Sequence, residues 1–167
     1  MKITIDLTKE DYWNMNKFVM FHIPKYRNLL MLTFISLPII IIAMLRFVLD
    51  YSWAYSIIIG ILVSALSAFY MIFSIKRKVM RLVKTNAGTV GKHAIELNGE
   101  GMYETTEYNN LEYSWKEIEA IKSDKDYIYI FVNSVQAINI PKRAFADDEQ
   151  EQAFVHQLEQ YTHKKIS

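Results

Sequence analysis

Residues 29–75 read LLMLTFISLPIIIIAMLRFVLDYSWAYSIIIGILVSALSAFYMIFSI. The segment holds two apolar stretches, Leu29–Leu49 and Trp53–Ile75, with only residues 50–52 between them. They have about 21 and 23 residues and as helices would reach roughly 31 and 34 Å, enough to cross a hydrocarbon core of about 30 Å. The sequence therefore predicts a membrane hairpin of two transmembrane helices joined by a short outer loop.

The charge of the chain is divided between its two parts. Residues 1–92 carry twelve Lys or Arg and four Asp or Glu, a net +8, whereas residues 93–167 carry seven and fourteen, a net −7; together they give the +1 of the whole chain. The chain has no cysteine, which excludes disulfides, thiolate metal ligands and cysteine nucleophiles. Because residues 1–28 contain no long apolar run, we expect the first span to be an uncleaved anchor.

Basic residues gather at the two inner ends of the predicted hairpin. They are Lys17, Lys25, Arg27, Lys76, Arg77, Lys78, Arg81 and Lys84. The positive-inside rule then places both termini in the cytoplasm and makes the chain a multi-pass protein of the cytoplasmic membrane. Lys76, Arg77, Lys78, Arg81 and Lys84 could contact anionic lipid headgroups, and the alternative is that their charges only orient the hairpin.

The predicted spans also contain small and polar residues. Arg46 lies one turn from the end of the first span, where we expect it to snorkel outward and pair with Asp50 at i,i+4 spacing. The second span carries a ridge of small side chains that allows another helix to approach closely. The ridge consists of Ser56, Gly60, Ser64 and Ala68. Its partner is either the first span or a second copy of the chain.

The segment before the hairpin predicts a strand followed by a helix. Ile3, Ile5 and Leu7 alternate, which is the period of a half-buried strand over residues 2–7. Thr8 can cap the helix that follows, with Asp11 in the capping-box position. We therefore expect a cytoplasmic strand and helix in this segment.

The segment after the hairpin predicts strands closed by a helix. The expected strands are 94–97, 102–107, 110–115, 127–132 and 135–140, with Glu117–Ile121 closing the third. Asn98-Gly99 predicts a tight turn with positive φ. Asp147 should cap a final helix that carries Phe154, Leu158 and Tyr161 on one face.

These elements predict an α+β membrane protein with a two-helix hairpin inserted into its cytoplasmic domain. Residues 93–167, the tail, are too few to form a hydrophobic core easily on their own. We therefore expect the N-terminal strand and helix to complete the core of this domain. The predicted order is a strand and helix over 1–25, transmembrane helices over 28–49 and 53–75, an outer loop over 50–52, a basic stalk and connector over 76–92, and the domain over 93–167.

Three short motifs carry a family resemblance. They are Ser114-Trp115 with Ile118 shortly after, Tyr127–Phe131, and Ile140–Phe145. Together with the order of parts, they resemble the YcxB-like family of bacterial membrane proteins. The resemblance implies two transmembrane helices and a C-terminal domain of pleckstrin-homology-like arrangement, an antiparallel sheet closed by a helix. It implies no activity that could be assigned to particular residues.

Several residues of the tail have both a structural and a functional interpretation. Trp115 is a core anchor or a ligand platform. Lys142 and Arg143 could bind an anion or an acidic peptide, or lie in a solvated turn. Glu104 and Glu107 are expected to be exposed strand charges. We expect Trp115, Phe131, Phe154 and Leu158 to hold the domain together.

The sequence favours an interaction protein over an enzyme. It contains no phosphate-binding loop, nucleophile elbow or zinc motif, and its histidines lack metal-ligand spacing, so we identify no catalytic residue, cofactor, metal or small-molecule substrate. The acidic tail also makes nucleic acid an improbable partner. We expect a membrane-anchored scaffold or regulatory protein that presents its acidic domain to a protein partner or its own copies. The alternatives are an anionic-lipid or envelope-state sensor and, less favoured, a membrane hydrolase.

Overall fold

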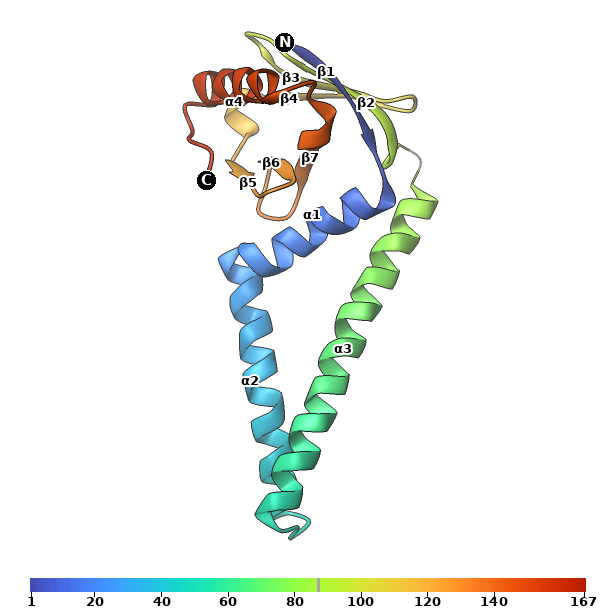
Figure 1. Ribbon diagram of the computed structural model, residues 1–167, viewed down its shortest axis with the longest axis vertical. Coiled ribbons are helices and arrows are strands. Elements are labelled where there is room, and N and C mark those ends of the chain that lie inside the picture. The colour runs from blue at the N-terminus through green and yellow to red at the C-terminus, as the bar shows by residue number, and fades with distance from the viewer. Residues whose placement is uncertain (87) are drawn as a thin grey trace. The chain divides into compact units, whose positions relative to one another are not determined.

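The computed structural model describes residues 1–86 and 88–167 and is α+β, as predicted (Figure 1). Ala87, in the predicted connector, lies outside the described residues. The chain forms two compact units: one joins Met1–Asn16 to Met80–Ser167, and the other is Lys17–Val79. The segments on either side of the hairpin therefore belong to one folded unit.

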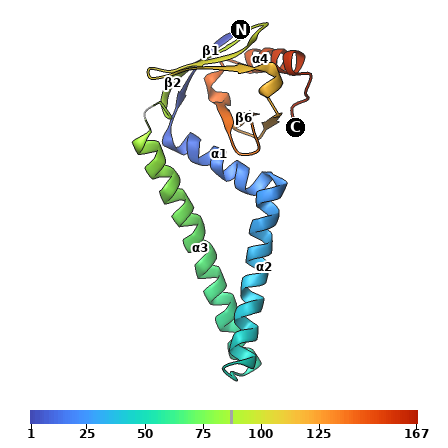
Figure 2. The ribbon, with the colours of Figure 1, turned by 180° about the vertical axis from the view of Figure 1, so that it is seen from behind.

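Two helices, α2 (Pro24–Phe47) and α3 (Trp53–Thr85), form the hairpin (Figure 2). Both are long and apolar enough to cross a membrane. Pro24 occupies the first turn of α2, where its missing amide hydrogen is not needed, and the preceding helix α1 (Lys9–His22) ends two residues earlier. Helix α3 continues through the predicted basic stalk to Thr85.

The helices of the hairpin approach closely at Gly60. A Cβ atom added to Gly60 would lie 2.4 Å from Cγ1 of Ile42 on α2, so a larger side chain would collide there. Near the turn between α2 and α3, Arg46 Nη1 lies 2.6 Å from Asp50 Oδ1, the ion pair expected from their spacing. The guanidinium of Arg46 also lies 5.7 Å from the ring centroid of Trp53, which links the two helices.

Within residues 1–86 and 88–167, seven strands form two antiparallel sheets rather than the one that was predicted. The first sheet has the order β1 (Lys2–Leu7), β2 (Gly91–Leu97), β3 (Gly101–Thr105), β4 (Asn110–Ser114), and the second has the order β5 (Ala120–Ser123), β6 (Tyr127–Phe131), β7 (Ala137–Pro141). Strand β1 pairs with β2, so the N-terminal strand completes the first sheet as predicted.

A short 3₁₀ turn, η1 (Trp115–Glu117), separates the two sheets. Glu117 accepts a hydrogen bond of 2.7 Å from the backbone amide of Ser114, and this cap ends β4. The chain then enters β5, which was not predicted as a strand because it has only four residues and one fully buried side chain, Ile121. The result is two layers joined at a tight corner.

The core lies between the two sheets and helix α4 (Asp148–Thr162). Phe154 and Leu158 of α4 are fully buried, and Asp147 caps the helix by accepting a 2.8 Å hydrogen bond from the amide of Gln150, as predicted. Trp115 packs at the edge of this core, where its ring stacks on Tyr161 at a centroid distance of 4.8 Å. Its indole N–H donates to the carbonyl of Asn98, as an anchor requires.

Two local predictions for the first sheet were wrong. Gly99 has no positive φ; among the described glycines, positive φ occurs at Gly88 and Gly91. The Asn98 side chain builds the turn instead, because its Oδ1 accepts from the amides of Glu100 and Gly101 at 2.9 and 3.1 Å. Glu104 is not an exposed charge, since it lies on the inner face of β3.

Candidate functional site

The first turn of α1 is held by a reciprocal cap. The carboxylate of Asp11 accepts a 2.7 Å hydrogen bond from the amide of Thr8, and the amide of Asp11 donates to the Thr8 hydroxyl at 3.2 Å. This is the predicted capping box, with aspartate in place of the more common glutamate. It fixes the Asp11 side chain on the face of α1 that packs inside the unit.

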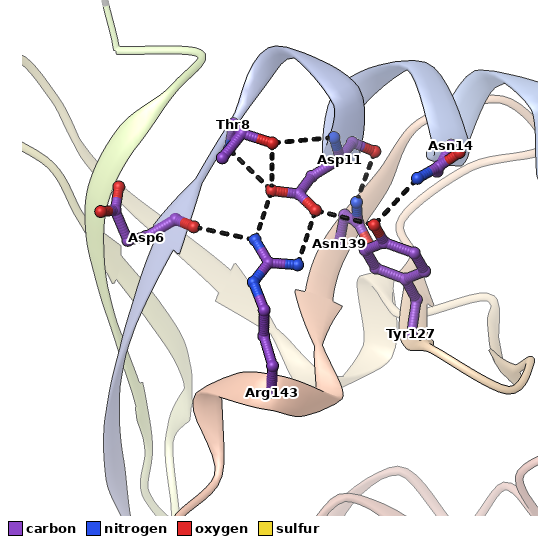
Figure 3. Close-up of polar contacts among 7 residues, drawn as sticks. All are labelled: Asp6, Thr8, Asp11, Asn14, Tyr127, Asn139 and Arg143. Atoms are coloured by element: carbon purple, nitrogen blue, oxygen red, sulfur yellow. Dashed lines mark hydrogen bonds and ion pairs between the residues drawn. The ribbon is translucent and has the colours of Figure 1, made fainter.

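Arg143 binds the same carboxylate from the far end of the chain (Figure 3). Its Nη1 donates to Asp11 Oδ1 at 2.8 Å and its Nη2 to Oδ2 at 2.6 Å, a bidentate pair. Nη2 also lies 3.3 Å from the carbonyl oxygen of Asp6 in β1. Arg143 comes from the 3₁₀ turn η2 (Lys142–Ala144), which directly follows β7. The pair therefore joins the segment before the hairpin to the segment after it.

Three further side chains complete the cluster in Figure 3. The hydroxyl of Tyr127 donates to Asp11 Oδ1 at 2.7 Å and accepts from Asn14 at 2.9 Å. The amide group of Asn139, on β7, donates to the backbone carbonyl of Asp11 at 2.8 Å. Asp11 thus receives donors from Thr8 at the start of its own helix, from β6, from β7 and from η2.

The electrostatics of the cluster favour an ionised Asp11. Burial raises the pKa of Asp11, but hydrogen bonds from Arg143 and the other donors lower it more, and the pKa ends well below its usual range. The pKa of Tyr127 is raised by burial and by its hydrogen bond to the anionic Asp11. The side chain of Asp11 is only 3% exposed, so the cluster is not an open site. It is a buried structural tie, by which we mean a set of hydrogen bonds that holds α1 against β6, β7 and η2.

The structure gives intramolecular partners to both basic residues that were considered for anion binding. Arg143 is bound to Asp11, although its side chain is 53% exposed. Lys142 Nζ lies 3.0 Å from a carboxylate oxygen of Glu151 on α4. From the sequence, Lys142 and Arg143 were expected either to bind an anion or to lie in a solvated turn. Neither alternative anticipated the two ion pairs. Both cations are already matched by carboxylates of the same unit.

A groove of about 730 Å³ lies beside α4. Its acidic lining consists of Glu149, Glu151 and Glu159, and its apolar lining of Ala153, Val155 and Ile166. Lys142 and His156 also line it, and Lys142 is paired with Glu151. The groove therefore combines an apolar surface with net negative charge.

The residues proposed for lipid contact all lie on α3. Arg77, Lys78, Arg81 and Lys84 are exposed, and Lys76 is half-buried. The guanidinium of Arg77 lies 4.8 Å from the ring centroid of Phe73. In the predicted packing ridge, Ser56 is buried, Gly60 meets Ile42, and Ser64 and Ala68 line a hollow with Phe34, Leu37 and Pro38. Lipid contact and self-association by these residues stay predictions.

Among the described residues, no group of three or more His, Cys, Asp or Glu side chains is placed to hold a metal ion. The sequence identified Asp11 only as a helix cap and Arg143 only as a surface cation. Their pairing spans 132 residues, and no local spacing could reveal it.

Comparisons with known proteins identify part of this unit. Residues 97–158 match the family model described as YcxB-like protein, which confirms the resemblance over β3 to β7 and most of α4. The comparisons with curated proteins and with solved structures gave no match.

Proposed function

We propose that this chain, in which residues 97–158 form a YcxB-like domain, is a membrane-anchored, non-enzymatic adaptor that presents an acidic domain to a protein partner. The hairpin would hold it in the cytoplasmic membrane with both termini in the cytoplasm. The domain, with its four-stranded and three-stranded sheets closed by α4, would have a pleckstrin-homology-like arrangement.

The exposed surface of the hairpin supports membrane residence. None of the α2 residues is buried, and large apolar side chains such as Leu32, Ile40 and Phe47 are more than half exposed. An apolar surface of this extent is unfavourable in water and is satisfied by lipid chains. The assembly of one unit from both flanks of the hairpin supports two termini on the same side.

The pairing of Lys142 and Arg143 is the observation that favours a protein partner over an anionic ligand. Both cations are bound to carboxylates, so the excess negative charge of residues 93–167 is left to attract a basic surface. The groove beside α4 also offers an apolar surface next to that negative charge. A partner with a basic, amphipathic segment fits this combination best.

Photo-crosslinking in native membranes tests this proposal. A photoreactive residue at Gln152, which lines the groove, should yield a discrete protein adduct that weakens at high salt. The matched control is the same residue at the exposed Val135, in the turn between β6 and β7, which should yield none. Equal adducts from both positions, or none from Gln152, would contradict the proposal.

An anionic-lipid sensor is the second candidate, and the exposure of Arg77, Lys78, Arg81 and Lys84 favours it. The full chain in nanodiscs of increasing anionic lipid content would then change its hydrogen exchange in residues 93–167. The adaptor proposal expects no change there. Reporter fusions at Tyr51 and Ser167 test the topology, and an external C-terminus would overturn both candidates.

A further inference from the structure

A buried polar pair interrupts the apolar inner face of the first sheet. On β2, His93 faces inward together with Ile95 and Leu97, and on β3, Glu104 faces inward together with Met102. His93 is 3% exposed and Glu104 9%, and His93 Nδ1 lies 2.7 Å from Glu104 Oε1. Apolar side chains would serve the core better at these two positions.

The ring of His93 has a second nitrogen that the pair does not use. Within the described part of the chain, Nε2 has no hydrogen-bond partner. A carboxylate can only accept, so Nδ1 carries the hydrogen that it shares with Glu104, as assigned from hydrogen-bond chemistry. In the neutral tautomer with the hydrogen on Nδ1, Nε2 is a buried acceptor.

Asn139 supplies a second acceptor of the same kind. Its Nδ2 donates to the carbonyl of Asp11 at 2.8 Å, which fixes the orientation of the amide group. Its Oδ1 has no partner among the described residues, and Asn139 is only 5% exposed. Two buried acceptors are thus left without donors, although buried polar groups are normally paired.

Both side chains line one cavity inside the unit formed by Met1–Asn16 and Met80–Ser167. The cavity has a volume of about 270 Å³. Its polar lining includes His93, Glu104, Asn139, Tyr12 and Tyr113, and its apolar lining Leu7, Met15, Leu111 and Ile138. This volume is near the lower limit of ligand pockets, so the cavity admits only a small molecule.

We infer that this cavity binds a small primary amine in its ammonium form, through His93 Nε2, Asn139 Oδ1 and the negative charge of Glu104. An ammonium group offers three donors and a positive charge, which matches two acceptors beside a carboxylate. A carboxylate or phosphate ligand would bring only acceptors, which cannot hydrogen-bond to these two acceptors. Its negative charge would also be repelled by Glu104. The inference goes beyond the proposed adaptor function and does not depend on it.

Histidine nitrogen NMR tests the inference directly. The probe is methylamine, titrated into the full chain with ¹⁵N-labelled histidine in nanodiscs of phosphatidylcholine, a lipid without a primary amine. We expect a saturable shift of the His93 Nε2 resonance. The exposed His22 and His163 are internal controls and should not move. Absence of a saturable shift, as for a cavity that holds only water, or a larger shift with sodium acetate, would overturn the inference.

Calorimetry with substituted chains provides a second measurement. His93→Phe should weaken methylamine binding at least tenfold, whereas His22→Phe, at an exposed position outside both the cavity and the groove beside α4, should leave it unchanged. Equal binding by both variants would overturn the inference. If His93→Phe does not fold, the shift of the His93 Nε2 resonance in the unsubstituted chain still tests the inference.

Nanodiscs of phosphatidylethanolamine identify the source of the amine. A shifted His93 resonance before methylamine is added would make a lipid headgroup the source. An unshifted resonance that moves on titration would make a free amine the source.

Discussion

Asp11 and Glu104 are both buried carboxylates that face a basic side chain within the same unit, yet their surroundings differ. Asp11 accepts hydrogen bonds from Thr8, Arg143 and Tyr127, and both of its oxygens have donors. Glu104 faces His93, whose second nitrogen has no partner among the described residues. One carboxylate lies in a completed network and the other beside unused acceptors.

The difference separates a structural tie from a candidate binding site. A completed network of charge-assisted hydrogen bonds rigidifies the parts that it joins, and Asp11 joins α1 to β6 and η2. An incomplete network keeps a capacity for further hydrogen bonds. Substitutions at the two sites should therefore have different consequences.

The largest effect is expected from Asp11→Ala. The substitution leaves the amide of Thr8, the guanidinium of Arg143 and the hydroxyl of Tyr127 without their acceptor. We expect the free energy of unfolding to fall by about 2–4 kcal/mol, because the helix cap is lost and buried donors are left unpaired, while the remaining charge of Arg143 is half exposed. Urea unfolding in detergent, followed by circular dichroism, measures this. Asp6→Ala, at an exposed position of β1, is the control and should change stability by less than about 0.5 kcal/mol.

Replacing each pair by two leucines tests the comparison itself. His93→Leu with Glu104→Leu removes both polar groups from an apolar face, so stability should stay within about 1 kcal/mol or rise. Asp11→Leu with Arg143→Leu should destabilise the unit, because the cap of α1 and the bond from Tyr127 are lost as well. Similar losses of stability in the two double variants would contradict the distinction.

The loss of folding stability at acidic pH should depend on Asp11. Its pKa in the folded chain lies below the ordinary value of about 3.9, so the unfolded chain binds the proton more readily. The stabilisation is fully present above about pH 4 and is lost as the pH falls toward the lowered pKa. Melting temperatures recorded against pH should converge for the natural chain and Asp11→Ala on acidification. Parallel curves would exclude this role.

A smaller effect is expected from Tyr113 at alkaline pH. Burial and the neighbouring Glu104 raise the pKa of Tyr113 to about 12, against an ordinary value of about 10. The unfolded chain therefore loses this proton first, and stability falls as the pH rises from about 10 toward 12. Tyr113→Phe should reduce that loss, while Tyr108→Phe, at an exposed position, should not. Melting curves across this pH range measure the difference.

The sequence predicts the features that depend on near neighbours. The apolar runs are long enough to define the hairpin, and the alternation of Ile3 and Ile5 defines β1. The caps of α1 and α4 follow from Asp11 and Asp147 at fixed spacings from their partners. These patterns need no knowledge of the tertiary fold.

The predictions failed where distant segments meet. The pairing of Asp11 with Arg143 depends on η2 meeting α1, which no spacing encodes. Glu104 could have been recognised as an inward residue, because it shares strand parity with the buried Met102. Its pairing with His93 depends on His93 belonging to β2, whereas the predicted strand began at Ala94.

The pairing of β1 with β2 has a consequence for biosynthesis. Lys2 lies opposite Glu96, so β1 waits for a partner strand that is made about 94 residues later. At a translation rate of about 5–20 residues per second, the delay is roughly 5–20 s. Throughout this interval β1 lacks its sheet partner, and the whole hairpin is synthesised within it. Closure of the first sheet can therefore occur only after the hairpin is complete, and folding of this unit marks the end of hairpin synthesis.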